Sequence, residues 1–253
     1  MLFYYTATGN CLYVARALDE NLISIPQALK KQILMFEDEV IGIVTPVYAG
    51  ETPKTVKKFI QKATLKANYV YIISTYGKGE SIASQWVVEY AKENGLEVHY
   101  ANTLLMVDNY LPSFDMNEEK ALDKKVNEQI ANIKKDIELK KCYIKEPTQA
   151  GIDLYNGAHL RFSENPHFIN GESLYVNEMC KGCGICTQVC PVGNMEVIDG
   201  KAIRKDKTCD FCLACIHHCP FKGLSLKYGD KNPEARYTHE KITLQDIIKA
   251  NKQ

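Results

Sequence analysis

The chain has 253 residues, 45% of them hydrophobic and 25% charged, which is enough for one large or two small globular domains. Its 31 basic and 31 acidic side chains balance, so the total charge gives no indication of nucleic-acid binding. No apolar run approaches the ~20 residues of a membrane-spanning helix, and the first residues lack the features of a secretory signal. We therefore expect a cytoplasmic protein that neither inserts into membranes nor binds nucleic acid.

Residues 1–141 alternate between short apolar runs and amphipathic stretches. Several of the runs are rich in Val, Ile and Tyr and apolar on both faces, as in strands of a buried parallel sheet. Because strand and helix patterns alternate through five rounds, we predict a doubly wound α/β domain with a five-stranded parallel sheet. The expected strands are Leu2–Tyr5, Leu22–Ile25, Val40–Thr45, Tyr69–Ser74 and Val98–Val107.

Three of the stretches between and after these runs carry apolar residues at helical spacing. The stripes run from Val56 to Ala63, from Ile82 to Tyr90 and from Leu122 to Ile137. In the last stripe the apolar residues are spaced by three or four positions, with charged residues between them, which predicts one long amphipathic helix.

The first expected strand leads into Thr6-Ala7-Thr8-Gly9-Asn10-Cys11, and a helical pattern follows. Backbone N–H groups at a helix N-terminus, together with two threonine hydroxyls, form an anion site. The loop has no Lys or Arg, so neutral donors would hold the anion, which suits the phosphate of FMN. A helix cap without a ligand is the alternative.

The third and fourth strands end in loops that each contain a tyrosine and glycines. In a doubly wound sheet the carboxyl ends of the first, third and fourth strands meet at the switch point, where ligands bind. Tyrosine rings can stack on an isoalloxazine, and glycines let the main chain approach its polar edge. The predicted flavin contacts in these two loops are Pro46, Val47, Tyr48, Ala49, Gly50, Thr75, Tyr76, Gly77 and Gly79.

The stretch after the fifth strand contains Asp108, Asn109 and Tyr110, which we also predict to contact the flavin. Its position suits a lid over the flavin or a face toward the second part of the chain. A plain turn before the next helix is the alternative.

The remaining chain divides into three parts. Prolines and glycines interrupt residues 142–173, which we expect to be an irregular connector packed onto the domains. Residues 174–228 form a cysteine-rich module. Residues 229–253 form a C-terminal extension with one short helix near Ile242–Ala250.

Eight of the ten cysteines lie between residues 180 and 219, in two repeats of the pattern C-x2-C-x2-C-x3-C-P. In this pattern three thiolates bind one [4Fe–4S] cluster, and the fourth binds the cluster of the other repeat. Structural zinc is the alternative, but it does not explain a spaced fourth cysteine before proline in both repeats. The predicted ligands are Cys180, Cys183, Cys186 and Cys219 for cluster 1, and Cys209, Cys212, Cys215 and Cys190 for cluster 2.

Four further side chains have two interpretations each. His217 and His218 lie between cluster ligands and could act as alternative ligands or in proton coupling, but we favour exposed or capping histidines. Cys11 lies at a helix N-terminus, which favours a lowered pKa unless a bound phosphate opposes it. Cys142 follows the long helix, and we expect it to be inert.

Thr6–Cys11 resembles the phosphate loop of flavodoxins, with Cys11 where that family has Thr or Ser. Residues 174–228 resemble the bacterial two-cluster ferredoxins. Over its full length, including Asp108–Pro112, the chain resembles flavodoxin–ferredoxin fusions, sometimes called ferrodoxins, which are common in anaerobic bacteria and archaea. This resemblance implies a flavodoxin-like FMN domain over residues 1–141, followed by a small α+β ferredoxin-like domain with two [4Fe–4S] clusters.

The expected function is electron transfer between the two clusters and FMN, which links one-electron and two-electron steps. The alternatives are an FMN-dependent reductase of a small substrate fed by the clusters, and a redox-sensing module. No general acid, base or substrate pocket is evident in the sequence, which favours the electron carrier. The expected partners are donor and acceptor proteins that the sequence does not identify, and the chain is compatible with an oligomer.

Overall fold

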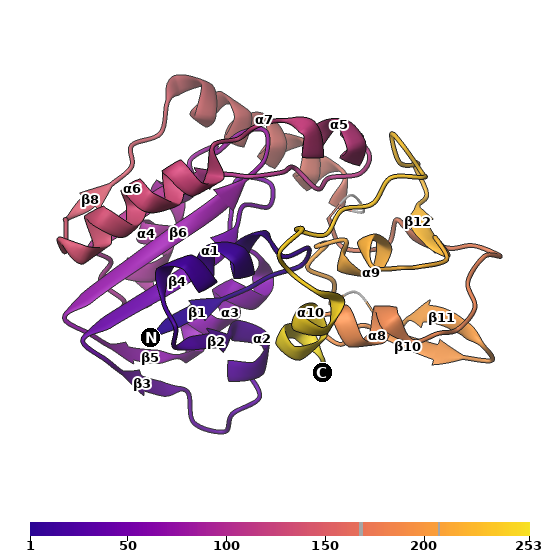
Figure 1. The fold of residues 1–253 in the computed structure, drawn as a ribbon, viewed down its shortest axis with the longest axis horizontal. Helices are drawn as coiled ribbons and strands as arrows, with labels where there is room; N and C mark the ends of the chain where they lie inside the picture. The colour runs from indigo at the N-terminus through magenta and orange to yellow at the C-terminus, as the bar shows by residue number, and fades with distance from the viewer. Residues whose placement is uncertain (167–168, 207) are drawn as a thin grey trace.

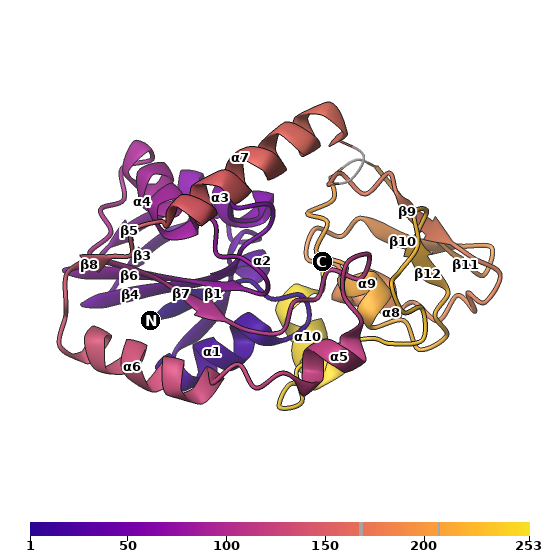
Figure 2. The same cartoon turned by 90° about the horizontal axis from the view of Figure 1, so that it is seen from above.

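The computed structural model describes residues 1–166, 169–206 and 208–253. A larger α/β region, formed by the N-terminal part of the chain, lies beside a smaller region formed by the C-terminal part (Figures 1 and 2). Within the described ranges no helix combines the length and apolarity needed to cross a membrane.

The larger region is built on a six-stranded parallel sheet with the order β2-β1-β4-β6-β7-β8. Its first five strands correspond to the five expected ones, and their order is that of flavodoxin-like folds. The predicted number of strands was too low by one, because two residues of the expected connector extend the sheet edge. The strands are β1 (Leu2–Tyr4), β2 (Leu22–Ser24), β4 (Val40–Pro46), β6 (Tyr69–Tyr76), β7 (Tyr100–Leu105) and β8 (Tyr143–Ile144).

Helices cover both faces of this sheet. The helices α1 (Asn10–Leu18) and α6 (Val126–Glu138) lie on one face, and α3 (Lys54–Lys62) and α4 (Ala83–Glu93) lie on the other (Figure 2). The doubly wound α/β fold is therefore confirmed. Shorter elements are α2 (Ile25–Ala28) and a parallel pair formed by β3 (Met35–Glu37) and β5 (Thr64–Lys66).

The predicted helix from Leu122 to Ile137 begins four residues later than expected. Leu122 is 56% exposed and follows a separate short helix, α5 (Met116–Ala121). Lys125, just before α6, has a left-handed backbone with φ of 51°, which breaks the helical path between the two elements. The apolar spacing at Leu122 thus continues the pattern without continuing the helix.

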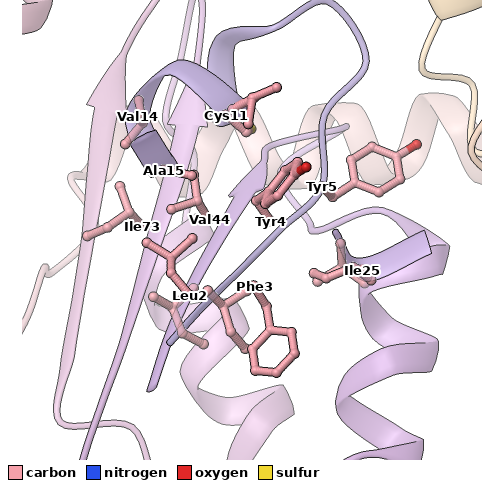
Figure 3. Packing of buried hydrophobic residues seen from close by; sticks show 14 of the residues in the cluster. Leu2, Phe3, Tyr4, Tyr5, Cys11, Val14, Ala15, Ile25, Val44 and Ile73 are labelled. Carbon is pink, nitrogen blue, oxygen red and sulfur yellow. The ribbon is translucent and has the colours of Figure 1, made fainter. Parts of the chain in front are cut away.

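The core of the α/β region lies between the sheet and its helices. Leu2, Val44 and Ile73 come from three neighbouring strands and lie close together in it (Figure 3). Phe3 packs edge-on against Phe36, with ring centroids 4.8 Å apart. Because β1, β4 and β6 pair in parallel, their three carboxyl ends lie at the same edge of the sheet.

The connector is not irregular as predicted, because most of it forms the sixteen-residue helix α7 (Gln149–Glu164). The Thr148 side chain caps this helix by accepting a hydrogen bond from the Gly151 N–H group at 3.1 Å. Gly151 allows close packing, since a Cβ atom there would lie 2.6 Å from the Ser81 carbonyl oxygen. The glycine that suggested a helix break therefore serves a helix contact.

The C-terminal region is a small α+β unit, as expected. Two antiparallel pairs flank its short helices, and β10 forms a hairpin with β11 while β9 pairs with β12. A capping box of Thr243 and Asp246 begins the last helix. The elements are β9 (Leu174–Val176), α8 (Ile185–Val189), β10 (Met195–Ile198), β11 (Lys201–Arg204), α9 (Ala214–His217), β12 (Leu224–Leu226) and α10 (Leu244–Asn251).

Candidate cofactor sites

A cavity of about 580 Å³ lies at the carboxyl ends of β1, β4 and β6. This is the switch point at which ligands bind in doubly wound sheets. Every residue predicted to contact a flavin lines this cavity except Gly9. The structure thus brings together four loops that are as much as a hundred residues apart in sequence.

Gly9 does not line the cavity, but its backbone conformation shapes the loop. Its φ of 104° lies in a region that favours glycine, and its N–H group donates to Thr6 Oγ1 at 3.2 Å. A Cβ atom at Gly9 would lie 2.9 Å from the Cβ atoms of His239 and Ile242. Gly9 therefore shapes the loop at the start of α1 and lets the C-terminal extension pack against its outer side.

Cys11 is a buried thiol rather than an activated one. Its Sγ lies 3.2 Å from Thr75 Oγ1, and burial raises its pKa to about 12. The expectation of a lowered pKa was wrong because desolvation outweighs the effect of the helix N-terminus. The thiol therefore offers the loop a weak hydrogen-bonding group where flavodoxins have a hydroxyl.

The loops after β4 and β6 approach the cavity through glycines with close neighbours. A Cβ atom at Gly77 would lie 2.3 Å from the Asp108 Cβ, so only glycine allows these two loops to meet. Ala49 and Gly50 both have left-handed backbones, with φ of 55° and 85°. Burial raises the pKa of Tyr48, which keeps its phenol neutral beside the cavity.

The stretch from Asp108 to Tyr110 is tied to the phosphate loop. Asn109 Nδ2 donates to Thr8 Oγ1 at 2.8 Å, and Asn10 Nδ2 donates to the Val107 carbonyl at 3.0 Å. Asp108 Oδ1 accepts from the Tyr110 N–H group at 2.9 Å, and burial raises the pKa of this carboxyl. These bonds make the stretch a fixed wall of the cavity rather than a plain turn.

Two further segments line the same cavity, and sequence reasoning did not assign either to it. One is the α7 face that carries Leu154, Ala158 and Phe162, and the other is Asp210, Phe211 and Leu213 from the second cysteine repeat. The spacing of four residues along α7 was a usable signal for a helix face. The contribution of the cysteine repeat depends on how the two regions pack, which no local pattern contains.

The cysteines line two smaller cavities in the C-terminal region. One is lined by Cys180, Cys183, Cys186 and Cys219, and the other by Cys190, Cys209, Cys212 and Cys215. This division is the one that the repeat spacing predicts, with each fourth cysteine crossing to the other set. Among the described residues, no group of three or more His, Cys, Asp or Glu side chains is close enough to hold a single metal ion.

Backbone N–H groups point at the sulfur atoms of both sets. Four such bonds measure 3.2 or 3.3 Å, and donors of this kind stabilise thiolate ligands of a cluster. The residues around the cysteines therefore fit iron–sulfur ligation. The bonds join Asn194 to Cys190, Ala202 to Cys180, Phe211 to Cys209 and Gly223 to Cys219.

The two repeats share left-handed backbones at two equivalent positions, which different residues occupy. In the first repeat Gly182 and Gly184 have φ of 63° and 76°. The equivalent positions in the second repeat are Phe211 and Leu213, with φ of 54° and 58°. A left-handed backbone costs a residue with a side chain roughly 1–2 kcal/mol, so the second repeat carries strain that the first avoids.

We expected His217 and His218 to be exposed or capping; both are buried, so exposure was wrong, whereas His218 does cap the end of α9. His217 Nδ1 accepts from the Tyr237 N–H group at 3.2 Å, so its Nε2 carries the proton and donates to the Asn109 carbonyl at 2.9 Å. His218 Nε2 lies 3.0 Å from the Ala7 carbonyl. Burial lowers the pKa of both rings, to about 3 for His217. The two histidines therefore join the second repeat to loops of the large cavity.

The C-terminal extension is hydrogen-bonded to the phosphate loop. Tyr237 Oη donates to Asn10 Oδ1 at 2.6 Å, and the His239 N–H group donates to the Thr8 carbonyl at 2.8 Å. The buried Asn251 Nδ2 donates both to the Thr6 carbonyl at 2.8 Å and to the Val189 carbonyl of α8 at 3.1 Å. One short segment thus connects the phosphate loop to the first cysteine repeat.

Comparison with known proteins assigns the C-terminal region. Residues 173–220 match the family described as "4Fe-4S dicluster domain". No curated protein gives a significant match. The iron–sulfur assignment supports a role in electron transfer.

Two solved structures show a weak likeness to the chain. Rubredoxin oxygen:oxidoreductase from the anaerobe Desulfovibrio gigas has 10% identity and a TM-score of 0.35 over 55% of this chain. The metal-soaked Flv1 flavodiiron core from Synechocystis sp. PCC6803 has 13% identity and a TM-score of 0.33 over 63%. The chain spans 36% of the length of each. By the strand order of its sheet, the N-terminal region has a flavodoxin-like α/β fold, and the C-terminal region is similar to the 4Fe-4S dicluster family over residues 173–220.

Proposed function

We propose that the protein carries electrons between two [4Fe–4S] clusters and FMN, without an organic substrate of its own. The two sets of four cysteines would hold the clusters. The loop Thr6–Cys11 would hold the phosphate of FMN, and the loops after β4, β6 and β7 would surround its ring. A [4Fe–4S] cluster exchanges one electron at a time and FMN accepts one or two, so the fusion would link the two kinds of step.

The observation that carries this proposal is a wall shared by two cavities. Asp210, Phe211 and Leu213 line the large cavity at the strand ends and also the cavity of the second cysteine set. Adjacent sites in one chain favour transfer within the molecule over diffusion between separate carriers. The buried histidines add to this, because they fix the second repeat against two loops of the large cavity.

The external partners would be donor and acceptor proteins. Cys183 is exposed, whereas the three other cysteines of its set are buried. The first cysteine set is therefore the more accessible to a one-electron carrier protein that approaches the C-terminal region.

A second candidate function is reduction of a small substrate at the flavin. The large cavity favours it, because α7 adds the apolar side chains of Leu154, Ala158 and Phe162 to its wall. Such a wall would suit an apolar molecule beside the ring. An added apolar oxidant that reoxidises the reduced protein with saturation kinetics would favour the reductase over the carrier.

The test of the proposed function is anaerobic purification followed by stepwise titration with dithionite. Iron analysis is expected to give about eight irons per chain, since two clusters of four are proposed. Visible absorption should show flavin bands, and EPR should show reducible cubane signals. Zinc without iron, after anaerobic reconstitution with iron and sulfide, would overturn the cluster assignment. Absence of flavin after incubation with FMN would overturn the proposed electron transfer between the clusters and FMN.

A further inference from the structure

The large cavity has one wall that comes from the cysteine repeat rather than from the α/β domain. Asp210, Phe211 and Leu213 face it from between the ligand positions Cys209 and Cys212 and just beyond. The loop is fixed against the α/β domain, since Lys54 Nζ donates to the Cys209 carbonyl at 3.5 Å. The position of this loop beside the cavity is therefore supported by a contact between the two regions.

Asp210 carries a buried carboxyl oxygen beside the large cavity, and Tyr5 and Thr55 lie next to this carboxyl. The residue is 7% exposed, and its Oδ2 has no hydrogen-bond partner among the residues that the structure describes. Buried polar atoms are rarely left unpaired, so this oxygen has capacity to accept a hydrogen bond from a group in the cavity. A ligand with an N–H group at that position would satisfy the carboxyl oxygen.

The backbone of the loop gives a second, independent indication. Phe211 and Leu213 adopt left-handed conformations at positions where the first repeat uses glycine. Glycine would satisfy the cluster geometry at lower conformational cost, as Gly182 and Gly184 show. Strain of this kind is retained where the side chain has a purpose, and here both side chains line the large cavity.

We propose that the loop Asp210–Leu213 is part of the flavin-binding site, with Asp210 as acceptor for an N–H group of the isoalloxazine and Phe211 and Leu213 as its apolar cover. This inference rests on the proposed function and deepens it. The flavin site is then composite, because the α/β domain supplies the phosphate loop and the cysteine repeat supplies part of the ring pocket. FMN affinity consequently depends on residues of the cluster domain.

The test compares FMN binding by the anaerobically reconstituted full-length protein and two variants. Phe211→Gly places in the second repeat the residue that the first repeat has at that position, so iron content should stay unchanged. Quenching of FMN fluorescence measures the dissociation constant. We expect it to rise about tenfold for Phe211→Gly and at least tenfold for Asp210→Ala, from the size of aromatic and charge-assisted contacts.

Phe221→Gly is the matched control, because Phe221 is 41% exposed and lines the cavity of the first cysteine set instead. Its FMN dissociation constant should equal that of the parent protein. Unchanged FMN affinity in both second-repeat variants, at unchanged iron content, would overturn the composite site while leaving the proposed function intact. A parent protein that fails to bind FMN would overturn the proposed function itself.

Discussion

The two cysteine repeats have the same spacing and left-handed backbones at the same two positions, yet they face different surroundings. The first has glycines between its ligands and an exposed Cys183. The second has Asp210, Phe211 and Leu213 at the corresponding places, beside the α/β domain. The cysteine spacing thus specifies the ligand set, whereas the residues between the cysteines determine which part of the protein packs against the site.

The largest effect is expected from removing one ligand in each repeat. Cys183→Ala and Cys212→Ala should each lower iron content by about four per chain, because each removes a ligand of one cluster. Cys212→Ala should also weaken FMN binding more than tenfold, since its loop would lose the support of the metal site. Iron analysis and FMN titration measure both effects. Equal FMN affinity in the two variants would remove the distinction between the repeats.

A smaller effect is expected at the buried histidine that fixes the second repeat. His217→Ala leaves the Asn109 carbonyl and the Tyr237 N–H group without their partner. The free energy of unfolding should fall by about 2–4 kcal/mol, as measured by urea denaturation of the iron-loaded protein. Gln188 occupies the equivalent position in the first repeat, and Gln188→Ala should cost less than about 0.5 kcal/mol. Similar losses of unfolding free energy in the two variants would contradict the difference between the repeats.

The first repeat should depend on the last helix of the C-terminal extension, α10. Asn251→Ala removes donors to the Thr6 and Val189 carbonyls and should lower the free energy of unfolding by about 1–3 kcal/mol. The variant should also weaken FMN binding, because Thr6 belongs to the phosphate loop. The exposed Gln245 on the same helix provides the control, and Gln245→Ala should change neither quantity. An Asn251→Ala protein with parental stability would show that the first repeat is held by other contacts.

The smallest effect is expected at the two cysteines outside the repeats, where one thiol is exposed and the other is buried. Cys142 is exposed, so this thiol, which the sequence led us to expect to be inert, is open to reagents, whereas burial raises the pKa of Cys11 to about 12. At pH 8 a thiol of that pKa is ionised to only about 10⁻⁴, so iodoacetamide should label Cys142 alone in the iron-loaded protein. Mass spectrometry of the labelled peptides measures this. Labelling of Cys11 at a rate comparable to Cys142 would show that its loop opens.

The sequence predicts those features that depend on local period and spacing. Five of the six sheet strands, the switch-point loops and the division of eight cysteines into two sets were visible in this way. The strand β8 was missed because two residues carry no period, and α7 was missed because Gly151 signals a break until its contact with Ser81 is known. The burial of His217 and His218 and the position of Phe211 arise from packing between regions. Such contacts join residues about a hundred or more positions apart and leave no local pattern.

The contact of Asn251 with Thr6 has a consequence for how the protein is made. The two residues are 245 positions apart, so the phosphate loop gains its outer contact only after nearly all the described chain has been synthesised. Closing so long a loop is entropically costly and slow, and native contacts of this range tend to form late. A growing chain that has not yet reached Asn251 would therefore hold a folded sheet whose phosphate loop still lacks this contact.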